Sequence, residues 1–489
     1  MDYQIPLVAR GEVIFSDMEE HGGRINDLRF RTPDASKHLR RIVVSDCGEL
    51  TDLYGVRLDE IFDYLVELGS LLDIGRNAYL QEAYEISRLA SNLPDGILRH
   101  IYESRLQPMF VRGFMEDLIE AQIGRSFLEG WVPHKHFDGR IVHVRAFGSR
   151  AVHIVPGNLP MAAATQILRA ALTRSDIIIK SPSNDPATPA AIVRTMIDLD
   201  RKHPVTRHAV AAYWKGGDSA VEDIIYNPQF IDRIMVWGGE ASINHVRRFL
   251  QPGLTVHPFD PKYSNSIIGC EIFVSDELMR EAAFRLACDI GGFNQEGCVN
   301  ARIVFVECDM TSTGIARLNT FAEYVYQAMM DLPDAFSSPS KINHAELQEN
   351  VENLAIYGEG FRVIGGKPLM GAIIVSQSDE TVEFARLLEG RVANLVPVAN
   401  LDIALSRLTH ASQTIGVYPD SLRERIRDRA AVHGAQRITS LGYATAFSIS
   451  NRLDAVEPLR EMCRWVIDEH CSPDAVLPPW TVSTGYQGI

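Results

Sequence analysis

Short apolar runs alternate with longer segments of helical period between residues 150 and 250. The apolar runs have the length and composition of buried strands, and they are RAVHIVP (150–156), DIIIK (176–180), RHAVAAYW (207–214) and DRIMVW (232–237). Between them, apolar residues recur three and four positions apart, which predicts helices over 161–174, 187–202, 218–226 and 240–250. Four strand and helix pairs in succession predict a doubly wound, parallel α/β sheet of the kind that binds nucleotides.

A second α/β region begins near residue 264. The segments 264–274 and 301–307 predict strands, and 276–291 predicts the helix between them. Ahead of the first sheet, IVHVRAF (141–147), the turn at Gly148 and Ser149, and RAVHIV together predict a hairpin. The tail after Pro473 is expected to be an extended arm.

Composition and charge narrow the class of protein. The 489 residues are 46% hydrophobic and 23% charged, as in ordinary globular proteins, and a net charge of −15 offers no basic surface for nucleic acid. No apolar run reaches the ~18 residues of a membrane span, and acidic residues interrupt the first thirty positions, so neither a span nor a signal peptide is expected. Seven scattered cysteines without a C-x-x-C pair predict no disulfide framework, no metal site and a reducing cytoplasm.

The common motifs for nucleotides and hydrolases are missing. No G-x-G-x-x-G follows a strand, and GFRVIGGKP (360–368) does not have P-loop spacing. G-x-S-x-G and H-E-x-x-H are absent as well. A nucleotide bound to this chain must therefore be held by another device.

The first segment with candidate chemistry is PGNLPM (156–161). Gly157 and Pro160 make a rigid turn that leaves Asn158 at the carboxyl end of a buried strand, the edge where open α/β sheets bind ligands. An amide held there can stabilise a developing oxyanion. An asparagine in a turn is, however, most often only a turn residue.

The second segment is IIIKSPSNDP (177–186). Lys180 ends an apolar strand and can reach a ribose or a phosphate, while Ser181 and Ser183 can donate hydrogen bonds. The alternative is a solvated strand end.

The third segment is GGFNQEGCVNAR (291–302), in which Cys298 lies in a loop next to Gly297. The other cysteines of this region, Cys270, Cys288 and Cys308, fit buried positions in the core. A loop that exposes the Cys298 thiol favours a nucleophile, provided that its pKa, ordinarily about 8.5, is lowered.

These motifs, in this order, resemble the aldehyde dehydrogenase superfamily. PGNLP is similar to its oxyanion loop P-W-N-F-P, IIIKSPS to V-V-K-P-S-E, MVWGGEASI (235–243) to the F-T-G-S loop, and FNQEGC to F-N-x-G-Q-x-C. Together with HGAQRITSLGYA and RLDAVEPLREMCRW within 433–465, they resemble most the acyl-CoA reductase branch, which includes the fatty-acid reductase of bacterial bioluminescence. The similarity covers residues 130–470.

The resemblance implies a fold and a domain plan. It implies an N-terminal part of the cofactor domain (1–134), an oligomerisation hairpin (135–151), a dinucleotide-binding domain (152–260), a catalytic domain (261–472) and a C-terminal oligomerisation arm (473–489). A homodimer or tetramer is expected from this plan.

It also implies an activity, the NADPH-dependent reduction of a fatty acyl-CoA thioester to the aldehyde. Cys298 would attack the thioester and release coenzyme A, Asn158 and the backbone N–H of Cys298 would hold the oxyanion, and hydride from NADPH would reduce the S-acyl-enzyme. The dinucleotide would be held by Lys180, Ser183, Trp237, Gly238 and Gly239. Trp237 has an alternative role in core packing.

Two departures from the superfamily pattern sharpen this expectation. Pro258 stands where hydrolytic relatives have a general-base Glu, which disfavours release of a carboxylate, although Asp260 is close enough to replace that base. Ser183 stands where the superfamily has a Glu that repels a 2′-phosphate, which favours NADPH. The carboxylate that would hold the nicotinamide ribose is not identified, and Glu389 is the nearest candidate.

Other interpretations stay open. The same parts can oxidise an aldehyde to acyl-CoA with NAD, and a non-catalytic subunit of an acyl-transfer complex can keep the fold. The acyl donor can be coenzyme A, an acyl carrier protein or a cysteine of a partner acyl-protein synthetase.

Overall fold

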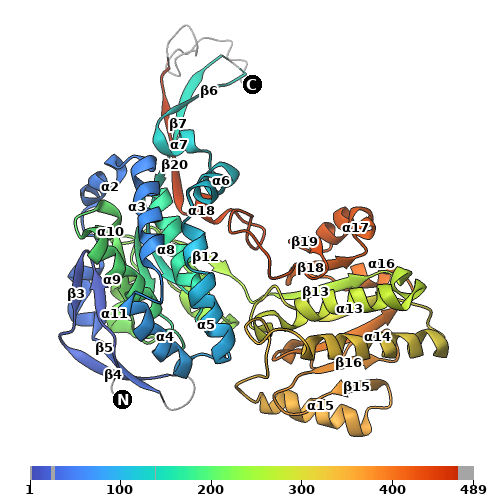
Figure 1. Cartoon of the computed structure of the whole chain (residues 1–489). Helices are drawn as coiled ribbons and strands as arrows, with labels where there is room; N and C mark the ends of the chain where they lie inside the picture. The colour runs from blue at the N-terminus through green and yellow to red at the C-terminus, as the bar shows by residue number, and fades with distance from the viewer. Residues whose placement is uncertain (1–2, 24–27, 138, 472–489) are drawn as a thin grey trace.

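The computed structural model describes residues 3–23, 28–137 and 139–471. Two seven-stranded sheets stand side by side in Figure 1, and a narrow three-stranded arm projects from one of them. No helix in these described ranges is both long and apolar enough to cross a membrane.

The first sheet has the order β12-β11-β8-β9-β10-β2-β3. Its strands are β12 (Thr255–Phe259), β11 (Arg233–Trp237), β8 (Arg150–Ile154), β9 (Asp176–Lys180), β10 (Ala209–Ala212), β2 (Leu7–Ala9) and β3 (Glu12–Ile14). The first five run parallel, and β2 and β3 add an antiparallel edge. Since the chain passes from β8 to β9 on one side and later to β11 on the other, the strand order reverses between β8 and β11. Ligands of open α/β sheets bind at such a switch point.

Helices cover both faces of this sheet because its strands are apolar on both sides. Ile177 and Ile179 pack in the core beneath α8 (Met161–Thr173) and α9 (Thr188–Asp200), whereas Ile178 packs in the opposite core. The remaining helices of this part of the molecule are α1 (Leu39–Ile42), α2 (Thr51–Gly55), α3 (Leu58–Leu71), α4 (Ala78–Ala90), α5 (Asp95–Ser104), α6 (Arg112–Gln122), α7 (Arg125–Glu129), α10 (Pro204–Arg207), α11 (Ser219–Ile225) and α12 (Glu240–Arg247).

The second sheet has the order β15-β16-β17-β14-β13-β18-β19. Its strands are β13 (Tyr263–Ile268), β14 (Ala301–Glu307), β15 (Phe361–Gly365), β16 (Ala372–Ser376), β17 (Val392–Val398), β18 (Ser412–Tyr418) and β19 (Arg437–Ser440). All run parallel except the edge strand β15. Its helices are α13 (Asp276–Gly291), α14 (Ser312–Met330), α15 (Ala345–Tyr357), α16 (Leu401–Ser406) and α17 (Asp420–Val432).

Two small sheets complete the fold. The arm consists of β6 (Val132–Lys135), β7 (Ile141–Gly148) and β20 (Cys463–Glu469), and the short α18 (Pro458–Glu461) leads into it. Near the N-terminus, β1 (Tyr3–Gln4), β4 (Met18–Gly22) and β5 (Arg29–Pro33) form a ribbon.

Two predictions about strands were wrong, and so was the buried position expected for Cys270. The hairpin partner of β7 is β6, and β8 pairs in the parallel core instead, because the chain leaves the arm at Ser149. The strand predicted over 264–274 stops at Ile268, and Cys270–Val274 forms a 3₁₀ turn in which Cys270 is exposed rather than buried. The predicted arm after Pro473 lies outside the described residues.

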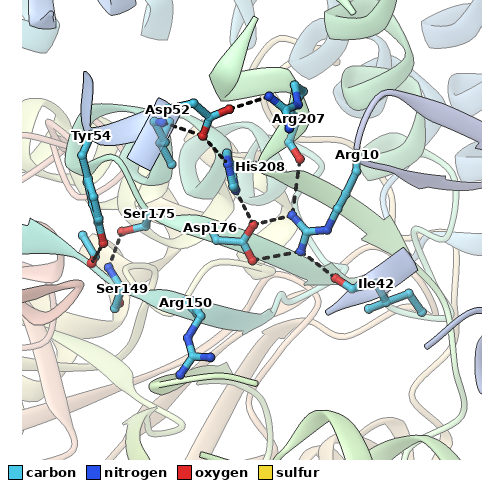
Figure 2. A network of polar contacts seen from close by, with 12 residues as sticks. Arg10, Ile42, Asp52, Tyr54, Ser149, Arg150, Ser175, Asp176, Arg207 and His208 are labelled. Carbon is cyan, nitrogen blue, oxygen red and sulfur yellow. Dashed lines mark hydrogen bonds and ion pairs between the residues drawn. The ribbon is translucent and has the colours of Figure 1, made fainter. Parts of the chain in front are cut away.

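A network of charged groups joins the amino ends of β9 and β10 (Figure 2). The buried Asp176 accepts hydrogen bonds from Arg10, with Nη2 3.1 Å from Oδ2, and its Oδ1 lies 2.9 Å from His208 Nδ1. His208 Nε2 lies 3.0 Å from Asp52, which also pairs with Arg207 at 2.7 Å. Burial raises the pKa of Asp176, but Arg10 and His208 outweigh it and bring the pKa to about 2. The network therefore ties the N-terminal segments to the sheet.

Candidate functional site

The turn that follows β8 contacts the loop that carries Cys298. Asn158 Nδ2 donates a hydrogen bond of 2.7 Å to the backbone carbonyl of Glu296, two residues before Cys298. Gly157 suits this turn, because a Cβ there would lie 1.9 Å from Asn184 Oδ1 and 2.8 Å from the ring of Pro182. The structure thus brings the predicted oxyanion donor to the predicted nucleophile loop, although these two segments are far apart in sequence.

The start of the nucleophile loop has an unusual backbone. Phe293, Asn294 and Gln295 have φ values of 50°, 52° and 67°, in the left-handed region that costs a non-glycine residue about 1–2 kcal/mol. Their own side chains stabilise this conformation. Asn294 exchanges two hydrogen bonds with the Ser338 backbone, and Gln295 bonds the backbones of Ala301 and Val392. The FNQ sequence is therefore a scaffold for the loop.

The residues on both sides of Cys298 are fixed by hydrogen bonds. Gly297 N donates to Asn300 Oδ1 at 3.1 Å, and Asn300 Nδ2 bonds the carbonyls of Asp289 and Gly292. Ser264 Oγ donates to the Cys298 carbonyl at 2.7 Å. These contacts fix the backbone while Cys298 itself is exposed, as the sequence analysis expected of a nucleophile.

The surroundings of the Cys298 thiol favour its protonated form. Desolvation together with the charge of Asp454 raises the pKa of the Cys298 thiol. A hydrogen bond from Gln413 and the charge of Arg302 act in the opposite direction. Since the net shift is upward, Cys298 is a thiol at neutral pH and needs a proton acceptor before it can attack a carbonyl.

A cavity of about 760 Å³ spans the carboxyl ends of β8, β9, β10 and β11. Its lining includes all the residues predicted for the cofactor, together with Asn158, and these are Lys180, Ser183, Trp237, Gly238 and Gly239. Lys180 lies 5.5 Å from the Trp214 ring, and Trp237 stacks on Phe259 at 4.0 Å while one side of it faces the cavity. Trp237 therefore packs in the core and also lines the cavity, and the binding of a cofactor here stays a prediction.

A second cavity, of about 380 Å³, lies beyond the same turn. It is lined mainly by apolar side chains, which include Met109, Phe114, Met161, Phe293, Phe447 and Ile449. Met161 ends the PGNLPM turn and Phe293 begins the nucleophile loop. The turn therefore borders one polar and one apolar cavity.

The structure also places the residues considered as a general base or as a ribose ligand. Pro258 lies within β12, and Asp260 points to Arg247 at 3.8 Å with 44% of its side chain exposed. Glu389 pairs with His344 at 2.6 Å, and this contact raises the pKa of His344.

Sequence reasoning missed Ser264, Gln413 and Asp454 near Cys298, and Glu20 and His21 in the larger cavity. One signal was available for Gln413. It lies between two polar residues at the start of the strand SQTIGVY, and an amide that becomes buried there needs a specific partner.

Comparison with known proteins identifies the family. A family model described as acyl-CoA reductase (LuxC) matches residues 56–465. Among curated relatives, a long-chain acyl-protein thioester reductase of Photorhabdus laumondii is 28% identical over 370 residues, which cover 74% of this chain and 72% of the relative. A protein of the same description from Vibrio harveyi is 24% identical over 480 residues, which cover 96% and 94%.

Solved structures confirm the predicted fold class. The NADP complex of NADP-dependent glyceraldehyde-3-phosphate dehydrogenase from Bacillus halodurans matches with a TM-score of 0.72 and 14% identity, over 96% of this chain and 99% of that one. Aldehyde dehydrogenase 21 from Physcomitrella patens also matches with a TM-score of 0.72, at 12% identity over 96% and 98%. The fold is aldehyde-dehydrogenase-like, and because the family model spans most of the sequence, this chain belongs to the acyl-CoA reductase (LuxC) family.

Proposed function

We propose that this protein reduces a long-chain acyl thioester to the aldehyde with NADPH, through an S-acyl intermediate on Cys298. The observation that carries the proposal is the hydrogen bond from Asn158 to the Glu296 carbonyl. It joins the nucleophile loop to the turn between a polar cavity and an apolar one. Family membership and the names of the acyl-protein thioester reductases support the same reaction class.

In the first step, the Cys298 thiolate attacks the thioester carbonyl. A bond forms between Sγ and the carbonyl carbon, and the oxyanion is held by the Asn158 amide and the backbone N–H of Cys298. The Glu296 carbonyl occupies one N–H of the Asn158 amide, and an amide nitrogen carries a second. Each such donor lowers the barrier by about 3–4 kcal/mol. The donor thiolate then leaves with the electrons of the broken C–S bond.

The larger cavity fits NADPH. When bound, NADPH supplies the hydride that reduces the acyl group. Lys180 and Lys215 bring positive charge to this cavity, Ser183 leaves room for a 2′-phosphate, and the acidic Glu20 on its wall is paired with Arg29 at 2.8 Å. Gly239 keeps the backbone accessible, because nothing lies within 4 Å of the position a Cβ would take. Cys298 leaves as thiolate when the aldehyde is released.

The apolar cavity fits the acyl chain. Its walls of methionine, phenylalanine and isoleucine side chains would stabilise the chain by about 0.8 kcal/mol for each buried methylene. The coenzyme A or protein part of the thioester substrate would lie outside this apolar cavity. Coenzyme A and a protein thiol can each carry the acyl group, and the names of the curated relatives favour the protein-bound form.

The test is to incubate wild type and Cys298→Ala with NADPH and either acyl-CoA or an acylated carrier protein, while NADPH loss and aldehyde formation are followed. We expect the Ala variant to lose at least about 1,000-fold in rate. Without NADPH, mass spectrometry should find an acyl adduct on Cys298 of the wild type. Cys288→Ala is the matched control, since that thiol lies within α13 and not in the loop that carries Cys298. Full turnover by Cys298→Ala, or an adduct on Cys288, would refute the proposal.

A further inference from the structure

The apolar cavity that borders the nucleophile loop has one cation in its wall. Among the described residues that line it, Arg105 carries a charge, and the others are apolar or bear a hydroxyl group. Ser104 at the end of α5, and Thr445 and Ser448 between β19 and α18, supply the hydroxyls. The cavity of about 380 Å³ therefore combines apolar walls with a single positive charge.

The end of a helix places Arg105 in this wall. α5 ends at Ser104, and the backbone N–H of Arg105 donates a hydrogen bond of 3.0 Å to the Ile101 carbonyl. The chain then turns into a 3₁₀ helix, Gln107–Phe110, in which Pro108 and Met109 also line the cavity. One wall of the cavity is thus formed by the chain on both sides of Arg105.

The half-buried guanidinium of Arg105 forms no ion pair with a carboxylate of the described residues. Its central carbon lies 5.9 Å from the centre of the Phe293 ring, at the start of the nucleophile loop. Its Nε is buried, and within the described part of the chain it has no hydrogen-bond partner. The neighbouring Glu103 pairs with Arg99 at 2.7 Å instead. A cation in these surroundings is stabilised by an anion that enters the cavity.

The acyl chain of a thioester substrate does not supply that anion. It is uncharged along its length, and in the proposed reaction the coenzyme A or protein part lies outside the cavity. A fatty acid differs because it joins the same apolar chain to a carboxylate, which forms charge-assisted hydrogen bonds with a guanidinium. Hydroxyl groups on the cavity wall, such as that of Thr445, can donate to the same carboxylate.

We propose that this cavity also binds a long-chain fatty acid as its anion, with the carboxylate on Arg105 and the chain against Met109, Phe114 and Met161. The acid and the acyl group of the substrate compete for the same apolar walls, so the acid is a reversible inhibitor. The inference rests on the proposed function in one respect, the placement of the acyl chain in this cavity. Charge distinguishes the acid from a neutral lipid of the same length.

The test compares dodecanoate with 1-dodecanol, which have the same chain but differ in charge at pH 8. Displacement of the neutral fluorophore N-phenyl-1-naphthylamine from the full-length protein measures both affinities. We expect dodecanoate to bind about 10-fold more tightly than the alcohol, because only the carboxylate forms a charge-assisted bond with the guanidinium. In Arg105→Met this preference should disappear while the alcohol binds as before. Arg105→Lys keeps the charge and should restore part of the preference.

Inhibition is a second readout. Dodecanoate should raise the KM for acyl-CoA of the wild type without changing kcat, and about 10-fold more dodecanoate should be needed for the same effect in Arg105→Met. Arg99→Met is the matched control, because it removes a cation of the same helix that is 66% exposed and paired with Glu103. This control should keep the preference of the wild type for the acid.

Several outcomes would overturn the inference. Equal affinities of the wild type for acid and alcohol would refute it and leave the proposed function intact. Equal weakening of both ligands in Arg105→Met would give Arg105 a purely structural role. An unchanged affinity for dodecanoate with a raised KM for acyl-CoA would assign Arg105 to the donor instead. If neither ligand binds the wild type, the acyl cavity of the proposed function fails as well. If Cys298→Ala keeps full turnover while the preference for the acid depends on Arg105, the proposed function fails alone.

Discussion

Two carboxylates in this protein have opposite surroundings. Asp176 meets the cations Arg10 and His208, and its pKa falls to about 2 (Figure 2). Asp454 is held by the neutral amide of Gln413, and burial raises its pKa. A carboxylate paired with cations keeps its charge and stabilises the fold, whereas one paired with a neutral amide has no hydrogen-bonded cation to offset the effect of burial on its pKa. The difference shows that nearby cations, rather than burial, decide whether the pKa of such a carboxylate falls.

The two ends of a single strand, β9, also have different surroundings. β9 begins at Asp176, in the charged network, and ends at Lys180, on the wall of the larger cavity. Parallel strands bring their amino ends to one edge of a sheet and their carboxyl ends to the other. The network therefore stabilises the sheet from the edge opposite the cavity, so that substitutions at the two edges should have separable effects.

The largest effect is expected from Asp176→Ala. It leaves Arg10 and His208 buried without their anion, and we expect a loss of about 3–5 kcal/mol in the free energy of unfolding. Urea denaturation at pH 7 measures it, and the KM for NADPH should stay unchanged where the variant is folded. A change in KM without a loss of stability would contradict the structural role of Asp176.

The pH dependence of that loss has a definite sign. Because folding lowers the pKa of Asp176 from 3.8 to about 2, its stabilisation is present above pH 3.8 and disappears as the pH falls toward 2. The difference in unfolding free energy between wild type and Asp176→Ala should therefore shrink below about pH 4.

In contrast to Asp176→Ala, Asn158→Ala should lower activity and have little effect on stability. Loss of the amide donor should lower kcat about 100–1,000-fold, while the half-buried position limits the effect on the melting temperature. Steady-state kinetics and thermal unfolding measure the two quantities. A normal kcat would exclude Asn158 from the oxyanion site.

Ser183→Glu tests the charge preference of the larger cavity. A carboxylate placed near the 2′-phosphate should raise the KM for NADPH about 10-fold and leave that for NADH nearly unchanged, a free-energy difference of about 1.4 kcal/mol. Equal changes for both dinucleotides would place the 2′-phosphate elsewhere. Ser181→Ala is the control on the neighbouring serine.

The smallest effect is expected from His208→Gln, at about 1 kcal/mol. Burial lowers the pKa of His208, but its bonds to Asp176 and Asp52 outweigh burial and raise it. The protonated form therefore stabilises the fold below the ordinary pKa of 6.5, and this contribution is lost as the pH rises through the folded pKa. In His208→Gln, the free energy of unfolding should not show this decline as the pH rises.

Much of the core could be predicted from the sequence because apolar periodicity reports burial directly. The predictions for β8, β9, β14, α8 and α13 agree with the structure to within about two residues. Predictions based on a local turn were weaker. Gly148 and Ser149 are compatible with a hairpin, but whether β7 pairs with β8 or with β6 depends on contacts distant in sequence.

The motif residues around Asn158 and Cys298 could be selected from the sequence because each lies in a turn or loop with a recognisable composition. The role of FNQ as a scaffold could not, since it depends on hydrogen bonds to Ser338 and Val392. Asp454 lies in a polar segment and has no signal of its own. Only the parallel pairing of β13 with β18 brings its partner Gln413 to the nucleophile.

The sequence by itself determined the two α/β regions, the strand ends that bear polar residues, and the cysteine in a glycine-containing loop. Local composition and periodicity suffice for these features. The tertiary structure alone decided which of the polar residues meet, because a hydrogen bond or a shifted pKa depends on distances between groups that the chain brings together only on folding. The pairing of Asp454 with Gln413, and that of Asp176 with Arg10 and His208, are of this kind.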